Sequence, residues 1–450
     1  MDLSALPADF RWGVATSAYQ TEGAVDADGR LSSIWDDFCR TPDAIDGGDT
    51  GVEASDSYRR WPADLDLLQR LGVASYRFSI AWPRVQPHGT GAVNQPGLDH
   101  YDRMVNDLLE VGIQPFVTLY HWDLPSPLQH RGGWVARDTA YRFADYAGLV
   151  AQRLGDRVVD WSTINEPLCC AWIAHLEGTM APGHRDLREA VHASHHLLLG
   201  HGLAAEAVRA QSAVKPSVGI VLNLSPCEPA SPSPDDLHAA ERADGHTNRW
   251  WLDPLHGRGY PNDMVEVYGI QPPVQSGDLE AIATPLDFVG VNYYFRMKVA
   301  ADDTVATLGY RAVPVAGANT TAMGWEIHPN GLRDVLLRVT KEYEPQALYV
   351  TESGAAFVDV PDEQGYVRDD DRADYLRAHI EATAAASADG APVRGFYSWS
   401  LIDNFEWAYG YRPRFGLAYV DYATQQRTIK YSGETYARLV REFQKTPRRA

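Results

Sequence analysis

The stretch WPADLDLLQRLGVASYRFSI, residues 61–80, contains the unit that decides the fold. Apolar residues recur at helical spacing in its first part, at Trp61, Leu65, Leu68 and Leu71. This spacing predicts an amphipathic helix, and Gly72 is a typical helix stop. The apolar and aromatic run VASYRFSI then predicts a strand. The stretch therefore predicts a helix, a tight turn and a buried strand in close succession.

The same unit recurs along the chain, with helical patterns that stop at Gly112 and Gly155 before the next apolar run. Together with an N-terminal run, the sequence predicts eight strands: FRWGVATSAYQ (10–20), VASYRFSI (73–80), IQPFVTLYHWD (113–123), VVDWSTINEP (158–167), SVGIVLNLS (217–225), PLDFVGVNYY (285–294), ALYVTESG (347–354) and PVRGFYSWSLIDN (392–404). These runs are apolar on both faces, which is typical of a parallel sheet covered by helices.

Two folds place helices around such strands, a closed barrel and an open doubly wound sheet. No Gly-rich dinucleotide loop follows the first strand, and no Pro/Gly/Ser-rich linker divides the chain. We therefore predict an α/β fold, a single-domain (β/α)8 TIM barrel with extended βα loops. The domain is expected to span residues 1–450, with peripheral tails at 1–9 and 444–450.

Composition and charge narrow the possible partners and compartment. The chain is 45% hydrophobic and 22% charged, which fits a globular protein, and its formal net charge of −20 disfavours a nucleic-acid partner. No run of 18 apolar residues predicts a membrane span, and the N-terminal sequence does not resemble an export signal. Four cysteines without CxxC spacing favour reduced thiols in the cytoplasm. The oligomeric state stays open.

Chemistry in such barrels is found where the strands end at their carboxyl side. The residues expected there are Gln20, Arg77, His121, Trp122, Asn165, Glu166, Asn292, Tyr294, Glu352 and Trp399, followed by Glu406 and Trp407 in the last loop. Amides, carboxylates and flat aromatic rings suit a sugar, whose hydroxyls need hydrogen bonds and whose C–H faces stack on indoles.

The sequence predicts neither a metal nor a cofactor. The histidines of HASHHLLLGH (192–201) fall on a predicted outer helix, away from the barrel mouth, and are expected to pack there. Two glutamates at strand ends, Glu166 and Glu352, instead suggest acid/base and nucleophilic catalysis on an acetal.

At these residues the chain resembles glycoside hydrolase family 1, the β-glucosidase family. The resemblance covers essentially the whole chain, in the family's order. The matching segments are FRWGVATSAYQTEGA (10–24), YRFSIAWPR (76–84), YHWDLP (120–125), TINEP (163–167), GVNYY (290–294), YVTESG (349–354) and SLIDNFEWAYGYRPRFGL (400–417).

The resemblance implies a role for each matching residue. Glu352 would be the nucleophile and Glu166 the acid/base, while Arg77, Asn292 and Tyr294 would surround and hold the nucleophile. The substrate-binding residues implied are Gln20, His121, Trp122, Asn165, Asn292, Tyr294, Trp325, Trp399, Glu406, Trp407 and Phe415.

The function expected from the resemblance is that of a retaining exo-β-glycosidase. We expect a β-glucosidase that hydrolyses cello-oligosaccharides and aryl or alkyl β-glucosides, with a place in cellulose degradation. A β-galactosidase or β-fucosidase of the same family and a non-catalytic sugar-binding relative are the alternatives. The non-catalytic relative is disfavoured because both glutamates are present. A 6-phospho-β-glycosidase is disfavoured because Glu406 and Trp407 stand where such relatives carry Ser and Lys.

The chain departs from the family pattern in two places. Ser353 follows the nucleophile where the family usually has Asn, which suggests looser support of that carboxylate. Leu168 stands where many members have Trp, and Cys169 follows it. We expect these two residues at the entrance of the +1 site, with weaker stacking of a second sugar.

Overall fold

The eight predicted strands form one closed parallel barrel, as expected for a (β/α)8 fold. The computed structural model describes residues 3–445. The barrel strands, in sequence order, are β1 (Arg11–Ala15), β2 (Ser75–Ser79), β3 (Gln114–Tyr120), β4 (Asp160–Asn165), β5 (Ser217–Asn223), β7 (Phe288–Asn292), β10 (Leu348–Ser353) and β11 (Val393–Trp399). The barrel closes where β1 pairs in parallel with both β2 and β11.

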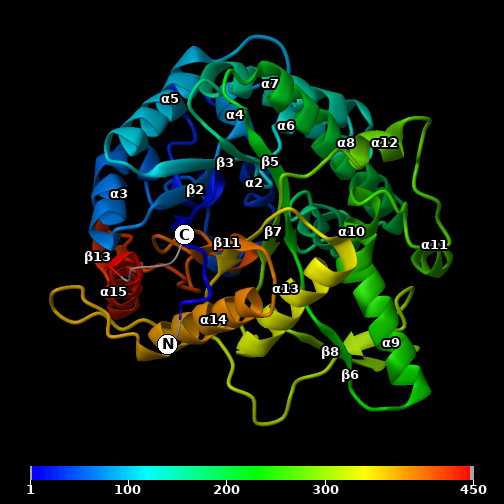
Figure 1. The fold of residues 1–450 in the computed structure, drawn as a ribbon. Helices are drawn as coiled ribbons and strands as arrows, with labels where there is room; N and C mark the ends of the chain where they lie inside the picture. Colours follow the sequence, from blue (N-terminus) through cyan, green and yellow to red (C-terminus); the bar gives the residue numbers. More distant parts are fainter. Residues whose placement is uncertain (1–2, 446–450) are drawn as a thin grey trace.

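Long helices surround the barrel, as Figure 1 shows. They are α3 (Ser57–Leu71), α5 (Gln95–Glu110), α7 (Asp138–Leu154), α8 (Leu187–Gln211), α13 (Pro329–Tyr343), α14 (Asp370–Ala388) and α15 (Tyr431–Lys445). The predicted stop after α3 is Gly72, whose φ of +71° lies in the left-handed region that favours glycine.

The loops carry further elements that the sequence analysis did not predict. Two small sheets lie outside the barrel, one formed by β6 (Cys227–Pro229), β8 (Met297–Ala301) and β9 (Tyr310–Ala312), the other by β12 (Ala418–Asp421) and β13 (Gln426–Ile429). The short α-helices are α1 (Ala18–Thr21), α2 (Ile34–Phe38), α4 (Trp82–Val85), α6 (Ser126–Gln129), α9 (Pro234–Asp244), α10 (Trp250–Leu255), α11 (Asn262–Tyr268) and α12 (Asp278–Ile282). Short 3₁₀ or π-helical turns are η1 (Ala27–Gly29), η2 (Asp46–Gly48), η3 (Gly133–Val135), η4 (Cys169–Glu177), η5 (Gly245–Arg249) and η6 (Trp407–Tyr409).

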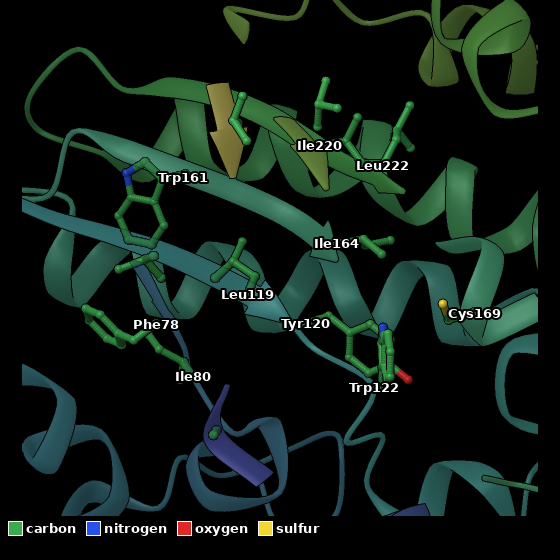
Figure 2. Packing of buried hydrophobic residues seen from close by; sticks show 14 of the residues in the cluster. Phe78, Ile80, Leu119, Tyr120, Trp122, Trp161, Ile164, Cys169, Ile220 and Leu222 are labelled. Carbon is green, nitrogen blue, oxygen red and sulfur yellow. The ribbon is translucent and has the colours of Figure 1, made fainter. Parts of the chain in front are cut away.

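The core fills the space between the barrel strands and the outer helices. Figure 2 shows Phe78, Leu119, Trp161 and Ile220, from four neighbouring strands, in this layer. Five tryptophans are buried in the same core cluster: Trp12, Trp35, Trp61, Trp82 and Trp161. Area removed from water by such side chains is the main favourable term in folding.

The histidines of α8 have partners within the protein. His195 bonds Tyr260 and Asp278, and the Nδ1 of His196 bonds the carbonyl of Trp134. These contacts lie on the outer side of the barrel, in accord with the expected packing role. Among the helices of residues 3–445, none combines the length and apolar character needed to cross a membrane.

The predicted peripheral tails are described only in part. Leu6 is buried at 2% exposure in the main core cluster, while Ser4, Ala5, Ala8 and Asp9 are exposed. At the other end, α15 continues to Lys445. Residues 1–2 and 446–450 lie outside the described part of the chain.

A buried ion cluster fixes the loop that follows β11. Lys430 donates a hydrogen bond of 2.7 Å to Asp403 in this loop and also contacts Asp359, which follows β10. Arg414 pairs with Asp403 at 2.7 Å and Arg372 with Asp359 at 2.9 Å. Asp403 also accepts from the backbone amide of Gly416 at 2.9 Å. The cluster therefore holds both ends of the loop in one position.

Lys430→Met should destabilise the protein strongly, because it leaves two buried aspartates without their shared cation. Breaking a buried ion pair typically costs about 3–5 kcal/mol. We expect a lower Tm in calorimetry than for Arg40→Met, since Arg40 pairs with Asp37 at the surface, where a pair contributes about 0–1 kcal/mol. Equal Tm values for the two variants would contradict this account of the cluster.

Candidate active site

A cavity of about 330 Å³ opens at the carboxyl ends of the barrel strands. Its walls contain both predicted catalytic glutamates and ten of the predicted substrate-binding residues, namely Gln20, His121, Trp122, Asn292, Tyr294, Trp325, Trp399, Glu406, Trp407 and Phe415. Arg77 and Asn165 are fully buried and do not line the cavity; they contact residues that do. The barrel thus brings together side chains from distant parts of the sequence, as the strand-end pattern predicted.

Glu352 lies at the end of β10 and is held by two donors. The Nη1 of Arg77 donates to Oε1 at 2.5 Å, and the hydroxyl of Tyr294 donates to Oε2 at 2.6 Å. The side chains of Arg77 and Glu352 are 1% and 4% exposed, so their attraction is little screened by water. The two hydrogen bonds fix the position of the Glu352 side chain, one at each oxygen.

Glu166 occupies a different environment at the end of β4. Burial, and after it the charge of Glu352, raises the pKa of Glu166 to about 8, while hydrogen bonds from Asn292 and Cys169 oppose this shift. Its backbone φ of +48° is unusual for a residue other than glycine, and such strained residues cluster at functional sites. Glu166 therefore keeps its proton to higher pH than a free glutamate does.

Asn292 supports Glu166 and not, as the sequence analysis expected, Glu352. Its Nδ2 donates to Oε1 of Glu166 at 2.7 Å, while its Oδ1 accepts from the hydroxyl of Thr351 at 2.8 Å. The strand register places Asn292 beside Glu352 in the backbone ladder. The Asn292 side chain nevertheless extends toward Glu166, because Arg77 and Tyr294 already donate hydrogen bonds to the two carboxylate oxygens of Glu352.

Asn165 links this support to His121. Its Oδ1 accepts from Arg77 at 2.6 Å and from Asn292 at 3.1 Å, so its Nδ2 must point the other way, toward Nε2 of His121 at 3.2 Å. Burial and the charge of Arg77 hold the pKa of His121 well below its usual value, so the ring is neutral. An accepting Nε2 leaves the ring proton on Nδ1, a buried atom without a hydrogen-bond partner within residues 3–445.

Glu406 is a further carboxylate of the cavity wall, and its pKa is raised as well. Burial, followed by the charges of Glu352 and Glu166, raises its pKa to about 8. The contact with Gln20 at 3.4 Å opposes this shift only weakly. Gln20 itself is fixed by hydrogen bonds to Asn404 at 3.1 Å and to the carbonyl of Phe405 at 2.9 Å.

Aromatic rings form the sides of the cavity. The Trp399 ring stacks on His121 with centroids 5.9 Å apart, and Trp407 lies 4.6 Å from Trp122. Trp325, also in the cavity wall, lies 6.1 Å from Phe415. Flat apolar walls beside carboxylates and amides are typical of a sugar-binding cavity.

Leu168 does not stand at the entrance of the site, contrary to expectation. It is 9% exposed and belongs to the buried core cluster. The chain enters the π-helical turn η4 directly after it, and this turn brings Cys169 and Ile173 to the cavity wall instead. Ser353 is buried as well, with its hydroxyl 3.3 Å from that of Tyr375 on α14.

Several lining residues escaped the sequence analysis: Ile173, Glu177, Thr179, Met180, Asn223, Ser225, Phe295, Met323, Ala408 and Tyr409. Asn223 could have been found, because it ends β5 and the backbone register aligns it with Asn292. The others lie on loops, whose course strand periodicity does not predict.

The comparisons with known proteins agree with this geometry. Residues 3–445 match the family model described as "Glycosyl hydrolase family 1". The chain is 45% identical to "Beta-glucosidase A" of Thermotoga maritima over 98% of this chain and 99% of the relative. It is also 45% identical to a "Bifunctional beta-D-glucosidase/beta-D-fucosidase" of Bifidobacterium breve over 96% of this chain and 98% of the relative. The solved structure "Beta-glucosidase from Thermotoga maritima in complex with glucoimidazole" superposes with a TM-score of 0.94 at 45% identity, over 97% of this chain and 99% of that one.

Glu166→Gln should stabilise the fold, and more so at higher pH. In the unfolded chain the Glu166 carboxyl loses its proton above about pH 4.5, whereas in the folded chain it keeps the proton until about pH 8. The free energy of unfolding of the wild type therefore falls as the pH rises between these values. Glutamine cannot ionise and avoids this loss. We expect the Tm gain over wild type to be small at pH 5 and larger at pH 8. A gain that is equal at both pH values, or matched by the exposed control Glu110→Gln, would contradict the raised pKa.

Proposed function

The chain belongs to glycosyl hydrolase family 1 and is a β-glucosidase, and on that premise we propose that Glu352 is its nucleophile and Glu166 its acid/base. One observation carries this assignment: two buried carboxylates line the same cavity, one held by a guanidinium and the other with a pKa raised to about 8. Opposite starting protonation of two neighbouring carboxylates is what double displacement at an acetal carbon requires.

In the first step Glu352 attacks the anomeric carbon, and Glu166 protonates the departing oxygen. A retaining pair is typically about 5–5.5 Å apart, which leaves no room for a water between them. Arg77 and Tyr294 hold Glu352 in position for the attack. The products of this step are the free aglycone alcohol and a glycosyl ester on Glu352, with Glu166 as a carboxylate.

In the second step Glu166 takes a proton from water, which displaces the ester and regenerates Glu352. The charge of Glu352 is one of the two main causes of the raised pKa of Glu166, and esterification removes that charge. The pKa of Glu166 therefore falls between the steps, which suits a base that must now stay ionised until water attacks. The same pair of residues thereby serves both halves of the reaction.

We propose that Glu406 and Gln20 recognise the glycone. Glu406, with its pKa near 8, offers both a donor and acceptors to the 4- and 6-hydroxyls of a glucosyl ring. The orphan Nδ1 of His121 and the Trp399 ring provide a further donor and a stacking face. Neither form of Glu406 supplies positive charge, which argues against a 6-phosphate on the sugar.

β-Fucosidase activity is a second candidate, favoured by the name of the Bifidobacterium breve relative. A β-D-fucoside lacks the 6-hydroxyl and carries an axial 4-hydroxyl, so it would change both contacts proposed for Glu406 and keep the catalytic pair unchanged. For the aglycone we propose a second glucosyl unit as well as aryl and alkyl groups, which fits cello-oligosaccharide breakdown. The free cysteines Cys39, Cys169, Cys170 and Cys227 support a reducing compartment such as the cytoplasm.

A 2-deoxy-2-fluoro β-glucoside with a good leaving group should label Glu352 covalently. The fluorine destabilises both transition states, and the leaving group restores only the first step, so the ester accumulates. Peptide mapping by mass spectrometry should find the label on the peptide that contains Glu352. A label on Glu166 or Glu406 would overturn the assignment.

Glu166→Ala should slow cellobiose hydrolysis far more than hydrolysis of a dinitrophenyl glucoside at the glycosylation step. General acid catalysis typically contributes about 10²–10⁴-fold, and a dinitrophenolate leaves without a proton. Single-turnover measurements on both substrates separate this step from ester hydrolysis. Equal losses on the two substrates would argue against the acid role.

A further inference from the structure

The two oxygens of Glu166 have different neighbours. Asn292 Nδ2 donates to Oε1 at 2.7 Å, and the Sγ of Cys169 lies 3.4 Å from Oε2. On its other side, this sulfur accepts from Nδ2 of Asn223 at 3.7 Å. Cys169 is buried in the cavity wall, just beyond the end of β4, and Figure 2 shows it past Ile164.

This arrangement decides which oxygen of Glu166 carries the proton. The Oδ1 of Asn292 is occupied by the hydroxyl of Thr351, so its amide nitrogen must face Glu166 and can only donate. The carbonyl oxygen of a carboxylic acid accepts such a bond better than the protonated oxygen does, which favours Oε1 as the carbonyl oxygen. The proton of the acid form therefore lies on Oε2, the oxygen beside the cysteine.

A thiol can serve Oε2 in both of its states. When Oε2 is protonated, the sulfur is a weak acceptor, which holds the proton without competing strongly with the oxygen of a leaving group. When Oε2 is ionised, the S–H group turns and donates to it. Burial and the charge of Glu166 raise the pKa of the Cys169 thiol, so the thiol keeps its own proton throughout.

We propose that Cys169 is a positioning residue for the acid/base step, whose thiol accepts from Glu166 in the acid form and donates to it in the base form. The inference rests on the proposed function, since it needs Glu166 to alternate between these forms. No bond to sulfur is made or broken. Asn223 fixes the sulfur, because its amide donates to Sγ from the end of the neighbouring strand β5.

Other titratable groups also influence the Glu166 and Cys169 pair. They are Arg77 from β2, Tyr294 after β7, Glu352 from β10, Glu406 after β11, and Cys170 and Glu177 from η4. All of them remain in a variant of Cys169. A change in the titration of Glu166 in such a variant therefore reports the thiol contact itself.

The test is the pH dependence of kcat/KM for an alkyl β-glucoside, which needs the protonated form of Glu166. In Cys169→Ala the Glu166 carboxylate loses a hydrogen-bond donor, so its pKa should rise. The basic limb of the kcat/KM profile should therefore move to higher pH by about 0.5 unit or more, a shift that one hydrogen bond to a charged group can produce. Cys169→Ser retains a donor and should keep the limb at or below its wild-type position. Cys170→Ala is the matched control, because Cys170 is equally buried but does not line the cavity.

A merely structural role of Cys169 would lower the Tm and leave the basic limb in place, so the Tm of each variant is measured in parallel. The proposal is overturned if Cys169→Ala leaves the limb unmoved or if Cys170→Ala moves it equally. Failure of the proposed function would be seen separately, as equal losses on the two substrates of Glu166→Ala.

Discussion

The ion pair between Arg77 and Glu352 is the interaction on which the site depends. Glu166, Glu352 and Glu406 are three of the four carboxylates that line the cavity, and together they would repel one another if all were ionised. The guanidinium contacts Glu352 alone among them. The pKa values of Glu166 and Glu406 are raised by burial and by the charge of Glu352, so these two glutamates keep their protons to higher pH.

The same guanidinium also organises the neutral part of the site. Its second nitrogen fixes the Asn165 amide, and this orientation in turn sets the ring proton of His121. Asn292 faces Glu166 because Thr351 fills its oxygen. Each amide in this network has one allowed orientation, so donors and acceptors around the cavity are assigned before any sugar binds. Such preorganisation reduces the reorganisation needed during reaction.

The sequence predicted the barrel and the residues that meet at its mouth, because strand ends in a closed parallel barrel converge whatever the loops do. It did not predict the partner of Asn292, which depends on side-chain direction and not on register. It also misplaced Leu168, since the π-helical turn η4 rotates Cys169 to the wall. The protonation of Glu406 could not be read from the sequence either, because it depends on burial and on two distant carboxylates.

The central claim is that one carboxylate attacks the sugar directly while the other alternates between acid and base. The anomer formed first reports this most directly. With an aryl β-glucoside followed by ¹H NMR immediately after mixing, the account predicts that the β-anomer of glucose appears first and then mutarotates. Initial appearance of the α-anomer would mean that water attacks in a single displacement, and it would contradict the role given to Glu352.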